Sequence, residues 1–166
     1  MLMILYFHQD LDAALPHFYS HRERLVAIGE VGLDFTPWCA PTQQDRDDQM
    51  KVFIRQLDVA LELDLPVNIH SRSAAKVTID TMRQQGISRA LLHNFAGKPS
   101  VALEGVKAGY FFSFPPAVCR NQQERNEPAN IAVSCCYIAK VKGLSPHTVQ
   151  LVTAQNAYRL FSRASQ

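Results

Sequence analysis

The middle of the chain repeats one pattern that restricts its fold more than any other feature: a short apolar run, a loop, then an amphipathic stretch. The apolar runs are LVAIGEVGLDF, PVNIH, RALLHNF and YFFSF, separated by DDQMKVFIRQLDVALELDL, SAAKVTIDTMRQQ and PSVALEGVKA. Nearly continuous apolar strands that alternate with helices are typical of parallel βαβ units covered on both faces. We therefore predict an α/β fold, either a Rossmann-type sheet or a β/α barrel. Neither a G-x-G-x-x-G nor a P-loop motif is present, which disfavours the nucleotide-binding version.

Proline and glycine mark where the predicted helices end. Pro66 follows the first amphipathic stretch, and Gly86 and Gly109 follow the next two as C-terminal caps. Two more helices are predicted towards the C-terminus, the first ending at Gly143 and the second capped by Ser145. With 166 residues the chain is expected to form a single domain, residues 1–166, with βα units over 25–116 and C-terminal helices over 128–162.

Composition narrows the class of protein without naming a function. The hydrophobic fraction of 47% and the charged fraction of 19% are typical of a globular protein in water. The opening MLMILYF has the pattern of neither a signal peptide nor a membrane span, so we expect a cytoplasmic or nuclear protein without membrane contact. A net charge of +2 leaves nucleic-acid binding undecided. No C-x-x-C spacing occurs, so the four cysteines are expected to be reduced.

The residues that could do chemistry lie near the C-terminal ends of three predicted strands. Glu30 is embedded in an apolar run, and His70 and His93 each end a strand. The C-terminal ends of parallel strands meet at one mouth, where α/β folds place their sites. Two imidazoles and a carboxylate suit Zn²⁺, Mn²⁺ or Mg²⁺, so we predict a divalent-metal site with Glu30 also as catalytic residue. Such an ion lowers the pKa of its bound water, which favours hydrolysis as the reaction class.

Glycines flank the Glu30–Val31 pair, and alternation along a strand places Glu30, Gly32 and Asp34 on one face. We expect Gly32 to leave space beside the carboxylate for a ligand. Each candidate ligand also has a simpler interpretation: the histidines as hydrogen-bonded rim residues, and Glu30 as the partner of a buried Arg or Lys.

Three further residues are candidates for substrate binding: Arg72, Asp34 and Asn94. Arg72, two residues after His70, could clamp a phosphate or be a solvated loop residue. Asp34 could contact a ligating histidine, orient water, or cap the next helix.

Five segments in order, AIGEVGLDF, LPVNIHSRSA, LLHNFAGKPS, EGVKAGYFFSFPP and RNEPANI, resemble the motifs of the TatD-type deoxyribonucleases, which are metal-dependent hydrolases of the amidohydrolase-like barrel class. The resemblance extends from about residue 10 to residue 161. It implies a (β/α)₈ barrel with a divalent-metal centre that hydrolyses phosphodiester bonds of DNA, either from the 3′ end or internally. The family's glutamate and two of its metal-binding histidines correspond to Glu30, His70 and His93.

Two departures from the family pattern qualify what the resemblance implies. The chain has no H-x-H pair, which the family carries on its first strand, and no E-T-D-[SA]-P motif, whose aspartate is a metal ligand on its last strand. A complete barrel takes about 250 residues. We therefore expect a truncated form, a splice variant or gene fragment: a partial TIM barrel that lacks the first strands and the last one.

Such a chain should have impaired nuclease activity. Two alternatives remain open at this point. One is an inactive binding or regulatory variant that pairs with itself or a partner through exposed strand edges. The other is a hydrolase of a different ester, such as an aminoacyl ester or a small phosphoester.

Overall fold

The computed structural model describes residues 8–116 and 127–165. Its strands are β1 (Ile28–Asp34), β2 (Val67–Arg72), β3 (Ala90–Leu92) and β4 (Phe111–Phe112). Its α-helices are α1 (His8–Ser20), α2 (Gln43–Glu62), α3 (Ala75–Gln84), α4 (Pro99–Lys107), α5 (Ile131–Lys142) and α6 (Pro146–Leu160). Short 3₁₀ turns lie at Arg22–Arg24, Pro128–Asn130 and Ser162–Ser165.

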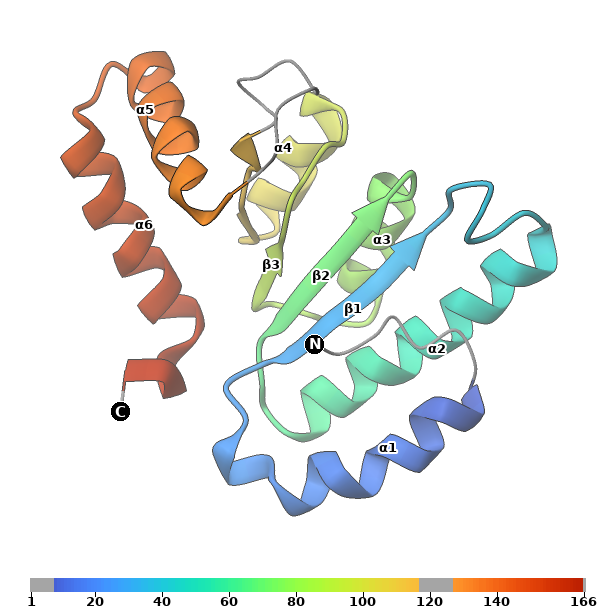
Figure 1. Cartoon of the computed structure of the whole chain (residues 1–166). Helices are drawn as coiled ribbons and strands as arrows, with labels where there is room; N and C mark the ends of the chain where they lie inside the picture. The colour runs from blue at the N-terminus through green and yellow to red at the C-terminus, as the bar shows by residue number, and fades with distance from the viewer. Residues whose placement is uncertain (1–7, 117–126, 166) are drawn as a thin grey trace.

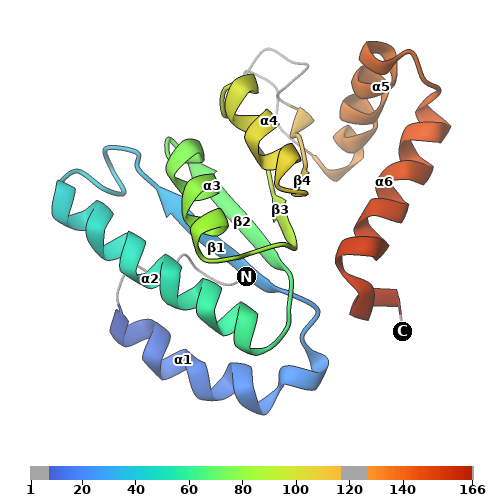
Figure 2. The ribbon, with the colours of Figure 1, turned by 180° about the vertical axis from the view of Figure 1, so that it is seen from behind.

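The four strands form one parallel sheet in the order β1-β2-β3-β4, which confirms the predicted α/β class. Each crossover advances by one strand in the same direction, and right-handed crossovers of this kind place all their helices on one face. Figure 1 shows α3 and α4 behind the strands, and Figure 2, from the opposite side, shows them in front. Helices on one face distinguish a β/α barrel from a doubly wound Rossmann sheet. The described strands are half the eight of a complete barrel.

The hydrophobic core lies between the sheet and these helices. Val31 and Leu33 of β1 are at most 1% exposed, and they belong to one buried cluster with Phe53 and Leu57 of α2. Ile79 of α3 joins the same cluster. Alternation along β1 therefore directs Val31 and Leu33 to the helices and leaves Glu30, Gly32 and Asp34 for the opposite face.

Helix α1 was not predicted from the sequence. It packs beside α2 (Figure 1), and Tyr19 donates a hydrogen bond to the carboxylate of Glu62 at the end of α2. Pro16 lies inside α1, an unfavourable position for proline that hides the helix from pattern analysis. The preceding MLMILYF lies outside the described residues.

The predicted helix ends are mostly confirmed. Gly143 is the C-cap residue of α5, and Gly86 and Gly109 directly follow the C-cap residues of α3 and α4; all three have positive φ angles. Ser145 accepts a hydrogen bond from the main-chain N–H of Thr148. Two details differ from the predictions. Helix α2 ends at Glu62, before Pro66, and strand β2 continues past His70 to Arg72 because its pairing with β1 extends to Asp34.

No helix among the described residues is long and apolar enough to cross a membrane. No disulfide joins Cys39, Cys135 or Cys136 to another described residue, as expected, whereas Cys119 lies outside the described residues.

Candidate metal centre

Glu30, His70 and His93 come together at the C-terminal end of the sheet. The Oε1 atom of Glu30 is 2.9 Å from Nδ1 of His70 and 2.8 Å from Nε2 of His93. One ligand atom from each of the three residues lies within 4.8 Å of the others. The side chains are partly exposed, at 37%, 18% and 24% for Glu30, His70 and His93, so solvent and a substrate can reach them.

The strand register brings these residues together. β1 and β2 pair with Gly32 opposite His70, and the main-chain N–H of His93 donates to the carbonyl of Ile69 at 3.0 Å. The three candidate ligands thus lie on β1, on β2 and directly after β3, which are adjacent strands of the sheet. Glu30 contacts the two imidazoles, and no Arg or Lys among the described residues forms an ion pair with it, contrary to the alternative considered from the sequence.

Gly32 has a different role from the one expected. A Cβ atom built at this position would lie 2.0 Å from the carbonyl oxygen of His70, and the φ angle is +145°. The space beside Gly32 is therefore filled by the main chain of β2 and is not open to a ligand. Gly29 is similar, since its Cβ would lie 2.6 Å from the Cβ of Asn68. Both glycines allow β1 to approach β2 closely at the site.

Asp34 contacts the outer nitrogen of His70. Its Oδ2 atom is 3.4 Å from Nε2 of His70, while its Oδ1 accepts hydrogen bonds from the Thr36 hydroxyl at 2.5 Å and from the Thr36 N–H at 3.0 Å. Burial opposes ionisation, but the hydrogen bonds from Thr36 and the contact with His70 outweigh it and hold the pKa of Asp34 below its usual value. A proton on Nε2 of His70, directed at the ionised Asp34, would leave the Nδ1 lone pair available to a cation bound beside Glu30.

Asp34 does not cap the next helix. Thr42 caps α2 instead, through a reciprocal capping box with Asp45. Gln49 of α2 fixes the end of β1 by a pair of 3.0 Å hydrogen bonds to the main chain of Asp34. The carboxylate of Asp34 is thereby oriented towards His70 by the elements on both sides of it.

The three residues fit a divalent cation. Their N/N/O donor set matches the ligands of Zn²⁺ and Mn²⁺, and three protein ligands leave coordination positions open, as in catalytic sites. Nε2 of His93 is a buried atom that has no hydrogen-bond partner among the described residues, despite its short distance from Glu30. A buried nitrogen with an unused lone pair is costly unless an ion or proton donor satisfies it.

The remaining predicted residues lie around this centre. Arg72 is exposed at the end of β2, and its guanidinium lies 5.1 Å from the centroid of the Trp38 ring. Asn94 is exposed directly after His93, with a φ angle of +50°, and its N–H donates to the hydroxyl of Ser113 at 3.1 Å. Substrate binding by Arg72, Asp34 and Asn94 stays a prediction.

A polar hollow of about 1050 Å³ opens beside the two histidines. Its basic side chains are those of Arg72, Lys76 and Lys98. Lys76 forms ion pairs with Asp80 at 2.7 Å and Glu104 at 2.9 Å, and these carboxylates raise its pKa. Arg72 and Lys98 form no ion pair with any described carboxylate, so they are the cations available to an anionic ligand.

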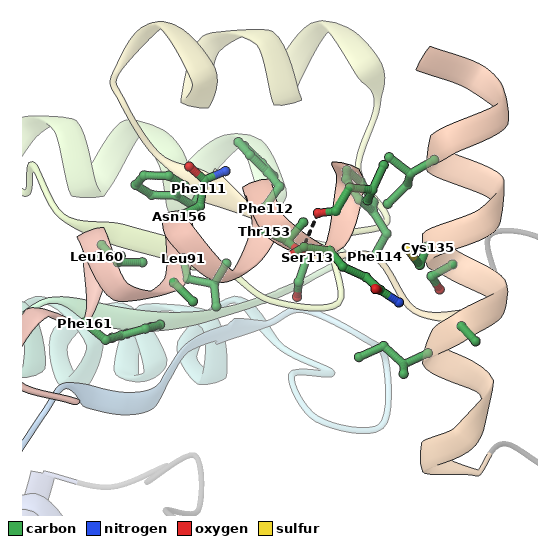
Figure 3. Close-up of a pocket in the computed structure, with 17 residues that line it drawn as sticks. Leu91, Phe111, Phe112, Ser113, Phe114, Cys135, Thr153, Asn156, Leu160 and Phe161 are labelled. Carbon is green, nitrogen blue, oxygen red and sulfur yellow. Dashed lines mark hydrogen bonds between the residues drawn. The ribbon is translucent and has the colours of Figure 1, made fainter. Parts of the chain in front are cut away.

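A second hollow of about 410 Å³ lies between the β4 side of the sheet and helices α5 and α6 (Figure 3). It is apolar and has no charged residue in its lining, which includes Phe111, Phe112 and Phe114 as well as Leu160 and Phe161 of the C-terminal region (Figure 3). We call it the apolar groove. Its lining contains no carboxylate, imidazole, lysine or arginine side chain.

Sequence reasoning missed the contributions of Trp38, Thr36 and Gln49. The signal for Thr36 was its position two residues after Asp34, within reach of the carboxylate. The role of Gln49 depends on helix packing and has no local signal.

Comparison with known proteins finds a family model and several relatives that match most of this chain. The family model described as TatD related DNase matches residues 6–125. The tatdn3 protein of Danio rerio is 56% identical, with 93% of this chain and 68% of the relative covered. The deoxyribonuclease TATDN3 of Homo sapiens is 46% identical, with 93% and 66% covered. The chain thus spans about two thirds of the length of these curated relatives.

The solved structures agree with a barrel-type fold. The TatD homologue YJJV of Escherichia coli K12 superposes with a TM-score of 0.76 at 21% identity, covering 91% of this chain and 71% of that one.

The alignment with the Danio rerio protein extends over 182 residues, whereas 93% of this chain amounts to only about 154 residues. The relative therefore has residues inside the matched region that have no counterpart here.

Proposed function

Because this chain belongs to the TatD-related DNase family, we propose that it is a metal-dependent hydrolase that acts on phosphodiester bonds of DNA at a centre formed by Glu30, His70 and His93. The observation that carries this proposal is the approach of the three ligand atoms to within 4.8 Å, from residues of β1 and β2 and from the residue that directly follows β3. The N/N/O donor set favours Zn²⁺ or Mn²⁺ as the ion over Mg²⁺, which prefers oxygen ligands.

The residues around the centre have separate parts in the proposed reaction. A bound divalent ion would lower the pKa of a coordinated water and polarise a phosphoryl oxygen. His70 would present Nδ1 to that ion while Asp34 holds its Nε2 proton, and His93 would present its buried Nε2. Glu30, predicted as a catalytic residue, lies between both imidazoles, and we propose that its carboxylate accepts the proton from the attacking water. Arg72 and Asn94, at the exposed rim, would contact the DNA.

The family motifs that this sequence does not contain determine the rate of DNA hydrolysis that we expect. The sequence contains neither the H-x-H pair nor the last-strand aspartate of the family pattern, so fewer metal ligands are present. We propose that turnover is therefore several powers of ten below that of a complete family member.

A thermal melt with and without metal tests the site directly. A ligand bound only to the folded state at 100 times its Kd adds about 2.7 kcal/mol. For a chain of this size that corresponds to a rise of roughly 5–10 °C in Tm. Purified, chelator-treated protein is melted in Mn²⁺ or Zn²⁺ and followed by circular dichroism. The rise should disappear in His70→Ala and persist in His147→Ala, which removes an exposed histidine of α6.

Cleavage of labelled DNA in the same metals tests the reaction. Slow, metal-dependent cleavage that stops in Glu30→Ala supports the proposal. A metal-induced rise in Tm that survives His70→Ala contradicts the site, and cleavage unaffected by Glu30→Ala contradicts the role of the carboxylate.

The apolar groove favours a second candidate function, a regulatory chain that pairs with another TatD-type chain. Among the described residues the sheet ends at β4, and Ser113 N–H bonds to Leu92 on the β3 side, so alternation directs the main chain of Phe112 towards the open side. An unpaired edge beside an apolar surface is a site for strand addition. Light scattering of the chain, alone and with a full-length relative, tests this function. A stable monomer in both samples contradicts it.

A further inference from the structure

Trp38 occupies an unusual position for the chain's single tryptophan. Its side chain is 70% exposed, whereas tryptophan is highly buried on average. It lies in the turn that directly follows β1, the strand that carries Glu30. The ring therefore stands at the same C-terminal rim of the sheet as the candidate metal centre.

The turn that carries Trp38 is fixed by hydrogen bonds. The carbonyl of Thr36 accepts from the N–H groups of Cys39 at 3.0 Å and Ala40 at 2.8 Å, while the side chain and N–H of Thr36 bond to Asp34. Asp34 in turn contacts His70. A rigid turn holds its aromatic side chain with little loss of conformational entropy on binding, and here its position relative to His70 is set by Asp34.

Arg72 places a positive charge beside this ring. Its guanidinium carbon is 5.1 Å from the ring centroid, within the range of a cation–π contact. Arg72 and His70 are two residues apart on β2 and so share a face of the sheet. Arg72 also lines the polar hollow, together with His70, His93 and Lys98. One planar cation and one exposed aromatic ring thus lie together at the rim that also carries the candidate metal centre.

We infer that Trp38 and Arg72 form a nucleotide-binding subsite beside the metal centre, where Trp38 stacks on a base of single-stranded DNA and Arg72 binds the adjacent phosphate. This inference rests on the proposed function, because it takes DNA as the ligand. Stacking on an aromatic side chain tolerates every base, and guanidinium groups bind phosphate through two parallel hydrogen bonds. The subsite therefore recognises an unpaired strand without sequence preference.

Because the chain has a single tryptophan, its intrinsic fluorescence reports directly on the subsite. The full chain is titrated in chelating buffer, where no metal-dependent cleavage occurs, with a single-stranded oligodeoxynucleotide or with an abasic oligomer of equal length and charge. We expect saturable quenching by the first oligomer. The Kd of the abasic oligomer should be at least about 5-fold higher, since one stacked base contributes a factor of this size or more.

Substitutions measured by the anisotropy of a labelled oligonucleotide separate stacking from charge. Trp38→Leu should raise the Kd at least about 5-fold for the normal oligomer and leave that of the abasic oligomer unchanged. Arg72→Ala should raise both. Tyr158→Leu, which removes an exposed aromatic ring from α6, should change neither.

Three results would overturn the inference: no oligonucleotide binding, equal affinity for normal and abasic oligomers, or a Trp38→Leu variant that binds like the parent. The inference and the proposed function fail separately. Trp38-dependent binding in a chain that shows no metal-induced rise in Tm would keep the subsite and reject the metal centre. Metal-dependent cleavage of DNA, combined with DNA binding that Trp38→Leu does not weaken, would keep the metal centre and reject the subsite.

Discussion

Replacing Gly32 with alanine should destabilise the protein more than any other single-methyl substitution at a glycine of positive φ. The added Cβ would lie 2.0 Å from the carbonyl oxygen of His70 and 2.8 Å from its carbonyl carbon, whereas ordinary contacts begin near 3.4 Å. An overlap of more than 1 Å with main-chain atoms cannot be relieved by a side-chain rotation. Strands β1 and β2 must move apart along the register that joins Ile28–Asp34 to β2.

The magnitude follows from two costs. Forcing an L-residue to a φ of +145° costs about 1–3 kcal/mol, and the steric overlap costs about 1–3 kcal/mol more. We expect a loss of about 2–6 kcal/mol in the free energy of unfolding, measured by urea denaturation. Because the displaced carbonyl belongs to His70, the metal-induced rise in Tm should also be reduced.

Gly86→Ala is the matched control. Gly86 also has a positive φ, +76°, but a Cβ there would have no atom within 4 Å. Only the conformational cost of about 1–2 kcal/mol applies. If Gly32→Ala destabilises no more than Gly86→Ala, the close approach of β1 to β2 at the site is refuted.

Three further predictions concern residues that support the site or the core. Because the folded-state pKa of Asp34 lies below its usual value, its ionisation stabilises the fold above about pH 4 and this contribution is lost as the pH falls further. Asp34→Asn should therefore be less stable than the parent at pH 7 in urea denaturation, with a difference that narrows at pH 3; a constant difference would contradict this linkage. Thr42→Ala removes the capping box of α2 and should cost about 1 kcal/mol in the same measurement, whereas Thr42→Ser should cost little. Phe53→Ala in the core should cost about 3–5 kcal/mol, against less than about 0.5 kcal/mol for Leu103→Ala at a 59% exposed position.

Much of the fold follows from local patterns in the sequence. The alternation of apolar runs with amphipathic stretches predicts β1 to β4 and the helices between them, and Gly143 and Ser145 mark the boundary between the last two helices. These features depend on residues close together in the chain. Helix α1 escaped prediction because its stability comes from contact with α2, and Pro16 obscures its pattern.

For the candidate site too, some features could be predicted from local sequence and others depend on tertiary packing. Strand ends predict that Glu30, His70 and His93 meet, because parallel strands align their C-terminal ends. The meaning of Gly32 could not be predicted, since the sequence does not show which main chain lies against it. The partners of Asp34 depend on how α2 and the following turn pack, which again is tertiary information.

The sequential order of the strands has a consequence for how the protein forms during translation. Each of β2, β3 and β4 pairs with the strand synthesised just before it, so none of these described strands has to wait for a distant segment to leave the ribosome. β2 completes the pairing partner for β1 once residue 72 has emerged, and the two strands already carry Glu30 and His70. β3 then adds to an existing edge and brings His93. The ligand set is therefore assembled in the order of synthesis, and a nascent chain stalled after residue 93 would already contain every residue of the proposed metal centre.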